Sequence, residues 1–424
     1  MSSTRNSIKT GFLFVLVASM MTGCFLKKDN IRTASNPGGY SASTGARYDL
    51  SGRDSSLFQV SRVAGEVVGP KLIYIQGGRT VLGAQESDVM GLRDNVERTV
   101  TVASFYMDET EVTNIDYREF LNDLKKINDK LYRDNLPDTN VWRSPLSFND
   151  MYVEYYFRHP GFNFYPVVGV SWAKAVDYSK WRTKKVFEVM NEGSGGRGRR
   201  GGPDTTATAA VDPTDPFAMP NKFQLIEQGL VLPEYRLPTE SEWEYAAKGM
   251  IGTQYLEENQ EYGRIYPWDG RGLRNPYTIN KKNKQGDFLA NFKRGRGDYG
   301  GIAGGITNDG EIIPDNVYKF MPNDFGLYNM AGNVNEWVYD TYRPLSFQDF
   351  DDLNPVRRDG RRDVQGDYTG RMTISDDSKV YKGGGWSDVA YWLAPGTRRY
   401  MHRDSATATI GFRCAMIAVG GEGK

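Results

Sequence analysis

The alternation of hydrophobic and polar positions predicts two strand-forming segments near the start of the folded part of the chain. Residues 72–75 form a short apolar run that stops at Gly77 and Gly78, and residues 100–107 form a second such run. Short apolar runs that end at glycine are typical of strands, since glycine disfavours the continuation of a strand. Before residue 70 the chain is rich in Ser, Gly, Asn, Arg and Thr and carries few apolar clusters.

Three helices are predicted from apolar residues that recur with helical spacing. The first begins at Asn114 as its cap, and its apolar positions are Tyr117, Phe120, Leu121 and Leu124. The second begins at Ser171, with apolar positions at Trp172, Ala175, Val176 and Trp181. The third begins at Thr239, where Thr239 and Glu242 have the spacing of a capping box, followed by Trp243, Ala246 and Ala247. The remainder reads as irregular.

The first 23 residues have the pattern of a secretion signal. Arg5 and Lys9 precede an apolar run at 12–21 that is too short to span a bilayer as a mature helix. The run ends at Met-Thr-Gly-Cys24, which resembles the lipobox of bacterial lipoproteins. The resemblance implies cleavage before Cys24 and acylation of Cys24. Phe25, rather than Asp, follows the cysteine, which favours the outer membrane, and the two lysines at 27–28 favour its periplasmic face.

Three parts follow from this pattern: a signal peptide at 1–23, a lipidated N-terminus and flexible tether at 24–69, and a folded region at 70–420. Within the folded region, three stretches read as insertions, at about 187–233, 293–315 and 343–377. The first contains a low-complexity basic run at 192–202, the second is rich in Gly, and the third is rich in Arg and Asp. Long surface loops on a rigid fold are candidate partner surfaces.

Composition excludes several classes of protein. The 53 basic and 53 acidic residues cancel, so a whole-protein basic field for nucleic acid is excluded. The chain has only two Cys and two His, which cannot build a disulfide scaffold or a multi-Cys metal cage. If Cys24 is acylated, Cys414 is the only thiol that remains. Aromatic residues at 13%, together with 47 Gly, favour a loop-rich fold held by large rings.

Two isolated patterns carry little chemistry. Gly196, Gly198 and Gly201 have G-x-G-x-x-G spacing, but a helical pattern precedes them and no helix is predicted after them, so we interpret the run as a basic loop and not a phosphate site. His159 and His402 lie far from other metal-ligating motifs, and we expect both to have structural or surface roles.

The informative motifs occur in one order along the chain. They are the segments 72–78 (LIYIQGG), 108–114 (DETEVTN), 166–172 (PVVGVSW), 236–247 (RLPTESEWEYAA), 266–268 (YPW), 323–337 (NDFGLYNMAGNVNEW), 380–386 (VYKGGGW) and 411–414 (GFRC). In this order they resemble the formylglycine-generating enzyme, or sulfatase-modifying factor, family over about residues 70–420. The resemblance implies one α+β domain with the formylglycine-generating-enzyme fold, which is related to C-type lectins, is irregular, has little regular secondary structure, and carries long insertions.

The copper-dependent oxidases of that family need two cysteines just after the Lys-Gly-Gly segment, because soft thiolates are the ligands that Cu(I) prefers. In this chain those positions correspond to about Asp388 and Leu393, and neither is Cys. We therefore expect no catalytic residue, no copper and no enzyme activity. Cys414 belongs to a structural motif of the family.

The resemblance also implies calcium. Carried over residue by residue, the ligands of one site are Asn329, Gly332, Val334 and Glu336, an oxygen-donor set of the kind that Ca²⁺ takes. A second site would use Asn291, Phe292 and Asp309. The alternative is that Asn and Glu cap turns here without any metal.

Further segments narrow the resemblance to one branch. The stretches 104–114, 141–143, 156–160 and 165–169, with Asp88-Val-Met90, are similar to gliding-motility lipoproteins of Bacteroidota. This branch implies a non-catalytic outer-membrane lipoprotein that serves type IX secretion and gliding. The implied partners are ring subunits of the GldK/PorK and GldN/PorN types or the outer-membrane translocon. We expect no nucleic-acid partner.

Three alternatives stay open from the sequence: a carbohydrate- or peptidoglycan-binding periplasmic lipoprotein, a ring subunit of the GldK/PorK type, and an enzyme with altered chemistry.

Overall fold

The computed structural model describes residues 40–41, 43–49, 56–59, 68–83, 90–92, 94–144, 148–194, 217, 234–249, 264–276, 285–293, 313–343, 352–357 and 377–418. The chain divides into two compact units, residues 1–64 with 223–230, and residues 65–222 with 231–424. The predicted signal segment and Cys24 lie outside the described residues. In the first unit, β1 (Tyr48–Asp49) pairs in parallel with β2 (Phe58–Gln59), within the stretch predicted as a tether.

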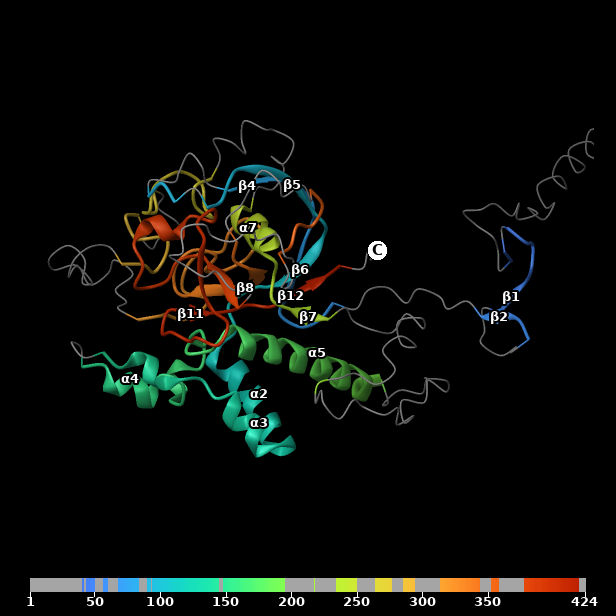
Figure 1. Ribbon diagram of the computed structural model, residues 1–424, viewed down its shortest axis with the longest axis horizontal. Helices are drawn as coiled ribbons and strands as arrows, with labels where there is room; N and C mark the ends of the chain where they lie inside the picture. The colour runs from blue at the N-terminus through green and yellow to red at the C-terminus, as the bar shows by residue number, and fades with distance from the viewer. Residues whose placement is uncertain are drawn as a thin grey trace, which may run out of the picture. The chain divides into compact units, whose positions relative to one another are not determined.

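The second unit contains two four-stranded sheets and one strand pair (Figure 1). In the first sheet, β3 (Leu72–Ile75), β6 (Phe105–Asp108), β12 (Ala415–Ile417) and β7 (Tyr235–Arg236) lie in that order, all antiparallel. In the second, β10 (Arg399–His402), β9 (Ser378–Lys382), β8 (Asn335–Thr341) and β11 (Ile410–Gly411) are neighbours. β4 (Gly78–Leu82) pairs with β5 (Arg98–Val102). The first sheet joins strands from both ends of the unit, whereas all four strands of the second sheet come from its C-terminal part.

Four α-helices lie together at one side of the strands in Figure 1: α2 (Asn114–Ile127), α3 (Asp129–Asp134), α4 (Asp150–Tyr155) and α5 (Trp172–Ser194). α7 (Glu240–Lys248) packs among the strands, against β4, β5 and β8. Short 3₁₀ turns are η2 (Thr139–Trp142), η3 (Pro160–Phe162) and η4 (Ala390–Leu393). No helix among the described residues is long and apolar enough to cross a bilayer.

The helix pattern read from the sequence is reproduced, with one change at the first cap. Thr113, not Asn114, is the N-cap of α2: its hydroxyl accepts from the Asp116 amide, and the Asp116 carboxylate accepts from the Thr113 amide. Asn114 is buried inside the first turn, where its side-chain amide donates to the carbonyls of Tyr156 and Phe162. Asn114 thus holds the loop that returns past the helix.

Aromatic rings of α2 and α5 build the largest part of the core. The Tyr117 and Tyr178 rings stack at 5.7 Å, and Phe120 meets Trp181 at 5.3 Å. All four rings are buried. The capping box of α7 is present as predicted, with the Glu242 amide 3.2 Å from the Thr239 hydroxyl, and this places the buried Trp243 against the second sheet. α5 continues to Ser194, past the predicted start of the first insertion.

The run at 100–107 forms two strands instead of one. β5 ends at Val102 and β6 begins at Phe105, and the hydroxyl of Ser104 in the connection accepts from the amide of Gly77. The chain therefore passes from the β4–β5 pair into the first four-stranded sheet at this point.

Candidate functional site

The position that the family resemblance assigned to the first copper cysteine holds an ion-paired carboxylate. Both oxygens of Asp388 accept from the guanidinium of Arg399, at 2.7 and 2.6 Å. The same carboxylate accepts from the Asn335 side chain and the Gly385 amide, each at 2.9 Å. Burial acts to raise the pKa of Asp388, but the hydrogen bonds and charge of Arg399 outweigh it and hold the pKa below its ordinary value.

The guanidinium of Arg399 also contacts two aromatic rings. Its guanidinium lies 5.0 Å from the ring centre of Tyr381 and 4.4 Å from that of Trp392, distances at which cation–π attraction acts. Its second terminal nitrogen also donates to the side-chain oxygen of Asn335 at 2.5 Å. Asp388 and Arg399 therefore fix the loop after β9 to both β8 and β10.

The position of the second copper cysteine is a core position. Leu393 is fully buried in a cluster with Ala290, Phe292 and Ala331, against which Tyr266 and Trp268 pack. An ion-paired carboxylate and an aliphatic side chain are not soft ligands, so the residues present do not fit a copper ion.

Cys414 is the thiol of the Gly-Phe-Arg-Cys motif, and it is fully buried in the core cluster that includes Tyr178 and Phe412. Its sulfur lies 3.4 Å from the hydroxyl of Ser179. Burial raises the pKa of the thiol to about 11, so it is protonated at neutral pH and is a poor nucleophile.

Of the residues predicted for the first calcium site, Asn329, Gly332 and Val334 lie in the loop that precedes β8, and Glu336 lies in β8 itself. Asn329 has a positive φ of 53° and Gly332 one of 80°. A Cβ on Gly332 would stand 2.5 Å from the carbonyl oxygen of Asn291, so only glycine allows this approach. Asn329 donates to the Glu111 carboxylate and the Val317 carbonyl, while its side-chain oxygen is buried without a hydrogen-bond partner.

Glu336, the carboxylate of that predicted set, is bonded inside the protein. Arg413 donates to both of its oxygens at 2.7 Å, and the indole of Trp243 donates at 2.7 Å. All three side chains are buried. The buried Asn329 oxygen fits a cation ligand, whereas Glu336 already has a guanidinium as its counter-charge.

Glu111 is a buried acid that the sequence reasoning did not single out. Its two oxygens accept from the side-chain amides of Asn329 and Asn333, at 3.0 and 2.9 Å. Burial raises its pKa to about 7, and the charge of Glu336 acts in the same direction. The sequence signal was present, because Glu111 lies in the 108–114 motif.

Two residues of the second predicted set, Asn291 and Phe292, lie among the described residues. Asp309 lies outside the described residues. The backbone amide of Asp315 donates to the side-chain oxygen of Asn333 at 2.7 Å. Asn291 and Phe292 are buried, and Asn291 donates to the carbonyl of Ile313 at 2.9 Å, two residues before Asp315. The Asn291 side-chain oxygen is a second buried oxygen without a hydrogen-bond partner, and Asp315 pairs with Lys319.

Three asparagine amides therefore hold the 313–317 loop. Asn291, Asn333 and Asn329 donate to the carbonyls of Ile313, Asp315 and Val317 at 2.9, 3.3 and 3.0 Å. The backbone amide of Asn333 in turn donates to the backbone carbonyl of Asn291 at 2.9 Å. Asn291 and Asn329, one from each predicted set, are thus linked through Asn333 and the 313–317 loop.

The minor sequence patterns lie elsewhere. His402 is half-exposed on β10, with Asp377 and Asp404 at 4.0 and 3.8 Å, and His159 caps η3 by accepting from the Gly161 amide. Gly196, Gly198 and Gly201 lie outside the described residues. Among the described residues, no group of three or more His, Cys, Asp or Glu side chains is arranged to hold a metal.

Comparison with known proteins assigns the fold. Residues 59–418 match the family described as sulfatase-modifying factor enzyme 1-like domain. The mouse formylglycine-generating enzyme is 24% identical, over 95% of this chain and 93% of its own length. The mouse protein named inactive C-alpha-formylglycine-generating enzyme 2 is 27% identical, over 84% of this chain and 88% of its own length.

Solved structures with a similar arrangement include PvdO from Pseudomonas aeruginosa, at a TM-score of 0.47 and 17% identity over 82% of this chain and 94% of that one. The predicted fold class is confirmed, including its scarcity of regular secondary structure. The family contains relatives named as enzymes and relatives named as inactive. This chain belongs to the sulfatase-modifying factor enzyme 1-like family, the family of the formylglycine-generating enzymes.

Proposed function

We propose that the chain is a non-catalytic lipoprotein of the outer membrane, of the GldJ type, that acts as a structural component of the type IX secretion and gliding machinery. The lipobox at Cys24 and the branch-specific segments at 104–114, 141–143 and 156–160 support the proposal. Its partners are ring subunits of the GldK/PorK and GldN/PorN types or the translocon, and its lipid holds it at the periplasmic face.

The observation that carries the non-catalytic part is the Asp388–Arg399 pair. Where the resemblance places a thiolate, this chain has a carboxylate held by four hydrogen bonds from three residues. Where it places the second thiolate, Leu393 is fully buried. The one described cysteine is itself buried and protonated. A copper-dependent oxidation of a substrate thiol thus lacks its ligands.

A direct assay addresses catalysis. Purified chain is mixed with Cu(I) and a peptide that contains a cysteine, and oxygen uptake is followed alongside a control without protein. The proposal predicts uptake equal to the control and no aldehyde on the peptide. Oxygen uptake that rises in proportion to the amount of chain, with aldehyde formed, contradicts it.

A cellular assay addresses the role in secretion. Cells that lack the chain are expected to retain type IX cargo inside, and the wild-type chain restores export. Cys24→Ser, which removes the acylated residue, is expected to fail to restore it. The variant Asp404→Asn, at an exposed residue of the same domain, is the matched control and restores export fully. Normal export without the chain contradicts the proposal.

We further propose that calcium has a structural place in the asparagine cluster. The side-chain oxygens of Asn329 and Asn291 are buried without hydrogen-bond partners, and a buried oxygen without a partner is costly unless a cation or water meets it. Asn329 with Gly332, Val334 and Glu336 would hold one ion, and Asn291 with Phe292 and Asp309 would hold the other. The ion would fix loop geometry and take part in no reaction.

A further inference from the structure

The first sheet ends at strand β3, whose outer backbone groups are unbonded in the described part of the chain. The register pairs residues 72 and 74 of β3 with residues 108 and 106 of β6. The amide of Asp108 donates away from β3, to the carbonyl of Cys414, which precedes β12, at 2.9 Å. Because hydrogen-bonded and non-hydrogen-bonded pairs alternate in an antiparallel ladder, the amides and carbonyls of Leu72 and Tyr74 point out of the sheet. On that side neither residue makes a backbone hydrogen bond with the described residues.

This open stretch, the β3 window at residues 72–74, is bounded at both ends. On one side the carbonyl of Pro70 accepts from a guanidinium of α5 at 3.0 Å, and proline has no amide hydrogen to offer. On the other side the carbonyl of Gln76 accepts from a tyrosine hydroxyl of α7 at 2.8 Å. The unbonded groups of Leu72 and Tyr74 therefore lie symmetrically about Ile73.

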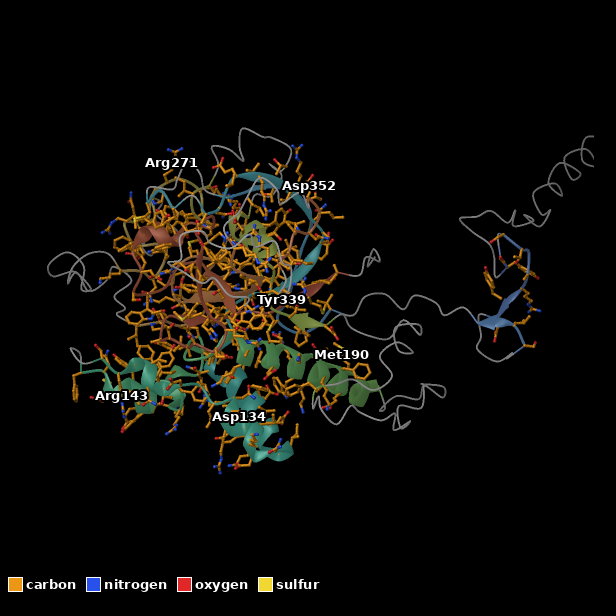
Figure 2. All side chains as sticks on the ribbon, viewed as in Figure 1. Asp134, Arg143, Met190, Arg271, Tyr339 and Asp352 are labelled. Carbon is orange, nitrogen blue, oxygen red and sulfur yellow. The ribbon has the colours of Figure 1, made fainter. Side chains whose placement is uncertain are left out.

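Two other strand edges are closed by contacts within the protein. At β7, the amide of Tyr235 donates to the hydroxyl of Thr183 at 2.9 Å. At β5, the amide of Thr101 donates to the carbonyl of Asp352 at 2.7 Å, and Figure 2 shows Asp352 beside the β4–β5 pair. An unpaired edge is a template for another strand, and proteins ordinarily cover or interrupt it. The β3 window is therefore a candidate site for strand pairing.

The side chains of Leu72 and Tyr74 lie on one face of β3, since alternate residues of a strand share a face. Leu72 packs against the core cluster that contains Tyr106, and the rings of Tyr74 and Tyr106 are 5.3 Å apart. Tyr74 is nevertheless 52% exposed. A half-exposed ring beside unbonded backbone groups offers both contacts that a neighbouring strand makes, a cross-strand side-chain contact and a hydrogen-bonded ladder.

We propose that the β3 window is the interface between two copies of this chain, which pair β3 with β3 in the antiparallel direction about a twofold axis at Ile73. In this register residue 72 of each copy lies opposite residue 74 of the other. The amide and carbonyl of Leu72 then bond those of Tyr74 in the second copy, so every unbonded group of both windows gains a partner. The Tyr74 ring also meets Leu72 of the second copy.

The symmetry of the β3 window is what favours a second copy as the occupant. An isologous contact uses the same patch on both copies, so a twofold axis needs open groups that are arranged symmetrically about one residue. Closed carbonyls at positions 70 and 76 end the window at equal distances from Ile73. An unrelated peptide would need no such centre. The pairing would join the first sheets of the two copies into one continuous sheet.

The first test separates the backbone contact from the side-chain contact. The parent is the full chain carrying Cys24→Ser, which prevents acylation, and analytical ultracentrifugation over a range of concentrations should show a monomer–dimer equilibrium. Tyr74→Ala removes the ring and keeps the amide hydrogen, whereas Tyr74→Pro removes both, and an edge position whose amide points outward tolerates proline. Tyr74→Pro should raise the dissociation constant at least about tenfold above that of Tyr74→Ala, because each copy loses a hydrogen bond. Matching thermal unfolding curves show that both variants fold.

The second test reads the register through disulfide formation in the same parent, whose remaining Cys414 is buried. Residues 73 of the two copies form a non-hydrogen-bonded pair with Cα atoms about 4.5 Å apart, a separation that a disulfide spans. Residues 74 are diagonal neighbours about 7–8 Å apart, which is too far. Under mild oxidation with diamide, Ile73→Cys should therefore form a linked dimer. Tyr74→Cys is the matched control and should form far less, although position 74 is the more exposed.

A parent chain that stays monomeric at every concentration overturns the proposal. A dimer that Tyr74→Pro and Tyr74→Ala weaken equally, or one that Tyr74→Cys links better than Ile73→Cys, also overturns it, because the copies must then meet through another surface or in another register.

Discussion

At the scale of single residues, the buried charges of Arg413, Glu336 and Glu111 hold the centre of the domain together. Arg413 is fully buried and donates one hydrogen bond to each oxygen of Glu336. The same guanidinium also donates to the backbone carbonyls of Asp108 and Tyr328. Its charge also offsets the buried Glu111. Removing one partner of such a set leaves an uncompensated charge in the core, which costs far more than the set contributes as a whole.

Arg413→Ala is therefore expected to lower the free energy of unfolding by about 3–5 kcal/mol. The measurement is urea unfolding followed by tryptophan fluorescence. The control is Arg133→Ala, which removes an exposed pair with Asp129 on α3 and is expected to cost about 0.5 kcal/mol or less. Equal losses in the two variants contradict the importance of the buried pair.

The calcium proposal is also tested at a single residue. Calcium at about 100 times its dissociation constant should stabilise the chain by about 2.7 kcal/mol, which is a rise of several degrees in Tm against a chelator. Asn329→Ala removes the buried side-chain oxygen of one proposed site, so the calcium-dependent rise should shrink, and Asn329→Ala with Asn291→Ala should abolish it. Asn128→Ala, at the exposed cap of α3, should keep it. No calcium response in the wild-type chain contradicts the proposal.

At the scale of elements, the carboxylate of Asp340 joins the N-terminus of α7 and the segment at 352–357 to strand β8. Asp340 of β8 accepts from the amide of Glu240 and the amide of Arg357, both at 2.7 Å. Glu240 in turn pairs with Arg398 and Lys382. Burial raises the pKa of Asp340 to about 6, and the charge of Glu240 acts in the same direction. The cations, despite burial, lower the pKa of Glu240 to about 2.

This pair predicts a pH dependence whose sign differs between the two acids. The folded-state pKa of Asp340 is above its unfolded value of 3.8, so its contribution is fully present below pH 3.8 and is lost as pH rises through about 6. The folded-state pKa of Glu240 is below its unfolded value of 4.5, so its contribution to stability is present above pH 4.5 and is lost as pH falls through about 2. In the wild-type chain, the free energy of unfolding should therefore fall by an amount on the order of 2 kcal/mol between pH 4.5 and 7. In Asp340→Asn, which has no carboxyl to titrate at this position, that fall should be absent. Urea unfolding at several pH values measures it, and Asp404→Asn should leave the slope unchanged.

The elements themselves were largely predictable, because helix caps and apolar spacing are local. The capping box at Thr239 and Glu242 specified α7, and the spacing of Tyr117 to Leu124 specified α2. The exact cap of α2 was missed by one residue, since both Thr113 and Asn114 are capping types and only tertiary contacts bury Asn114. The extension of α5 to Ser194 was missed because its last turns lack a clear apolar period.

At the scale of the whole molecule, what could not be read from the sequence is which distant side chains meet. Asp388 and Arg399 lie in a loop and an edge strand with no local signal that they pair. The contact of the Asn291 side-chain amide with the Ile313 carbonyl likewise has no local signal, because the Gly-rich stretch between them obscures the spacing and only the fold brings them together. The order of the motifs did predict the fold, through their resemblance to the family that residues 59–418 match.

At this scale we propose that a domain held by buried ion pairs, with no copper ligands at positions 388 and 393, is tethered to the outer membrane as a structural part of the type IX secretion machinery. The most direct measurement is affinity purification of the tagged, lipidated chain from native outer membranes, with cross-linking and mass spectrometry. The account predicts recovery of GldK/PorK- and GldN/PorN-type ring subunits or the translocon, with cross-links on this domain. Recovery of peptidoglycan-linked material alone, or of no partner, would contradict it and would favour a carbohydrate-binding role.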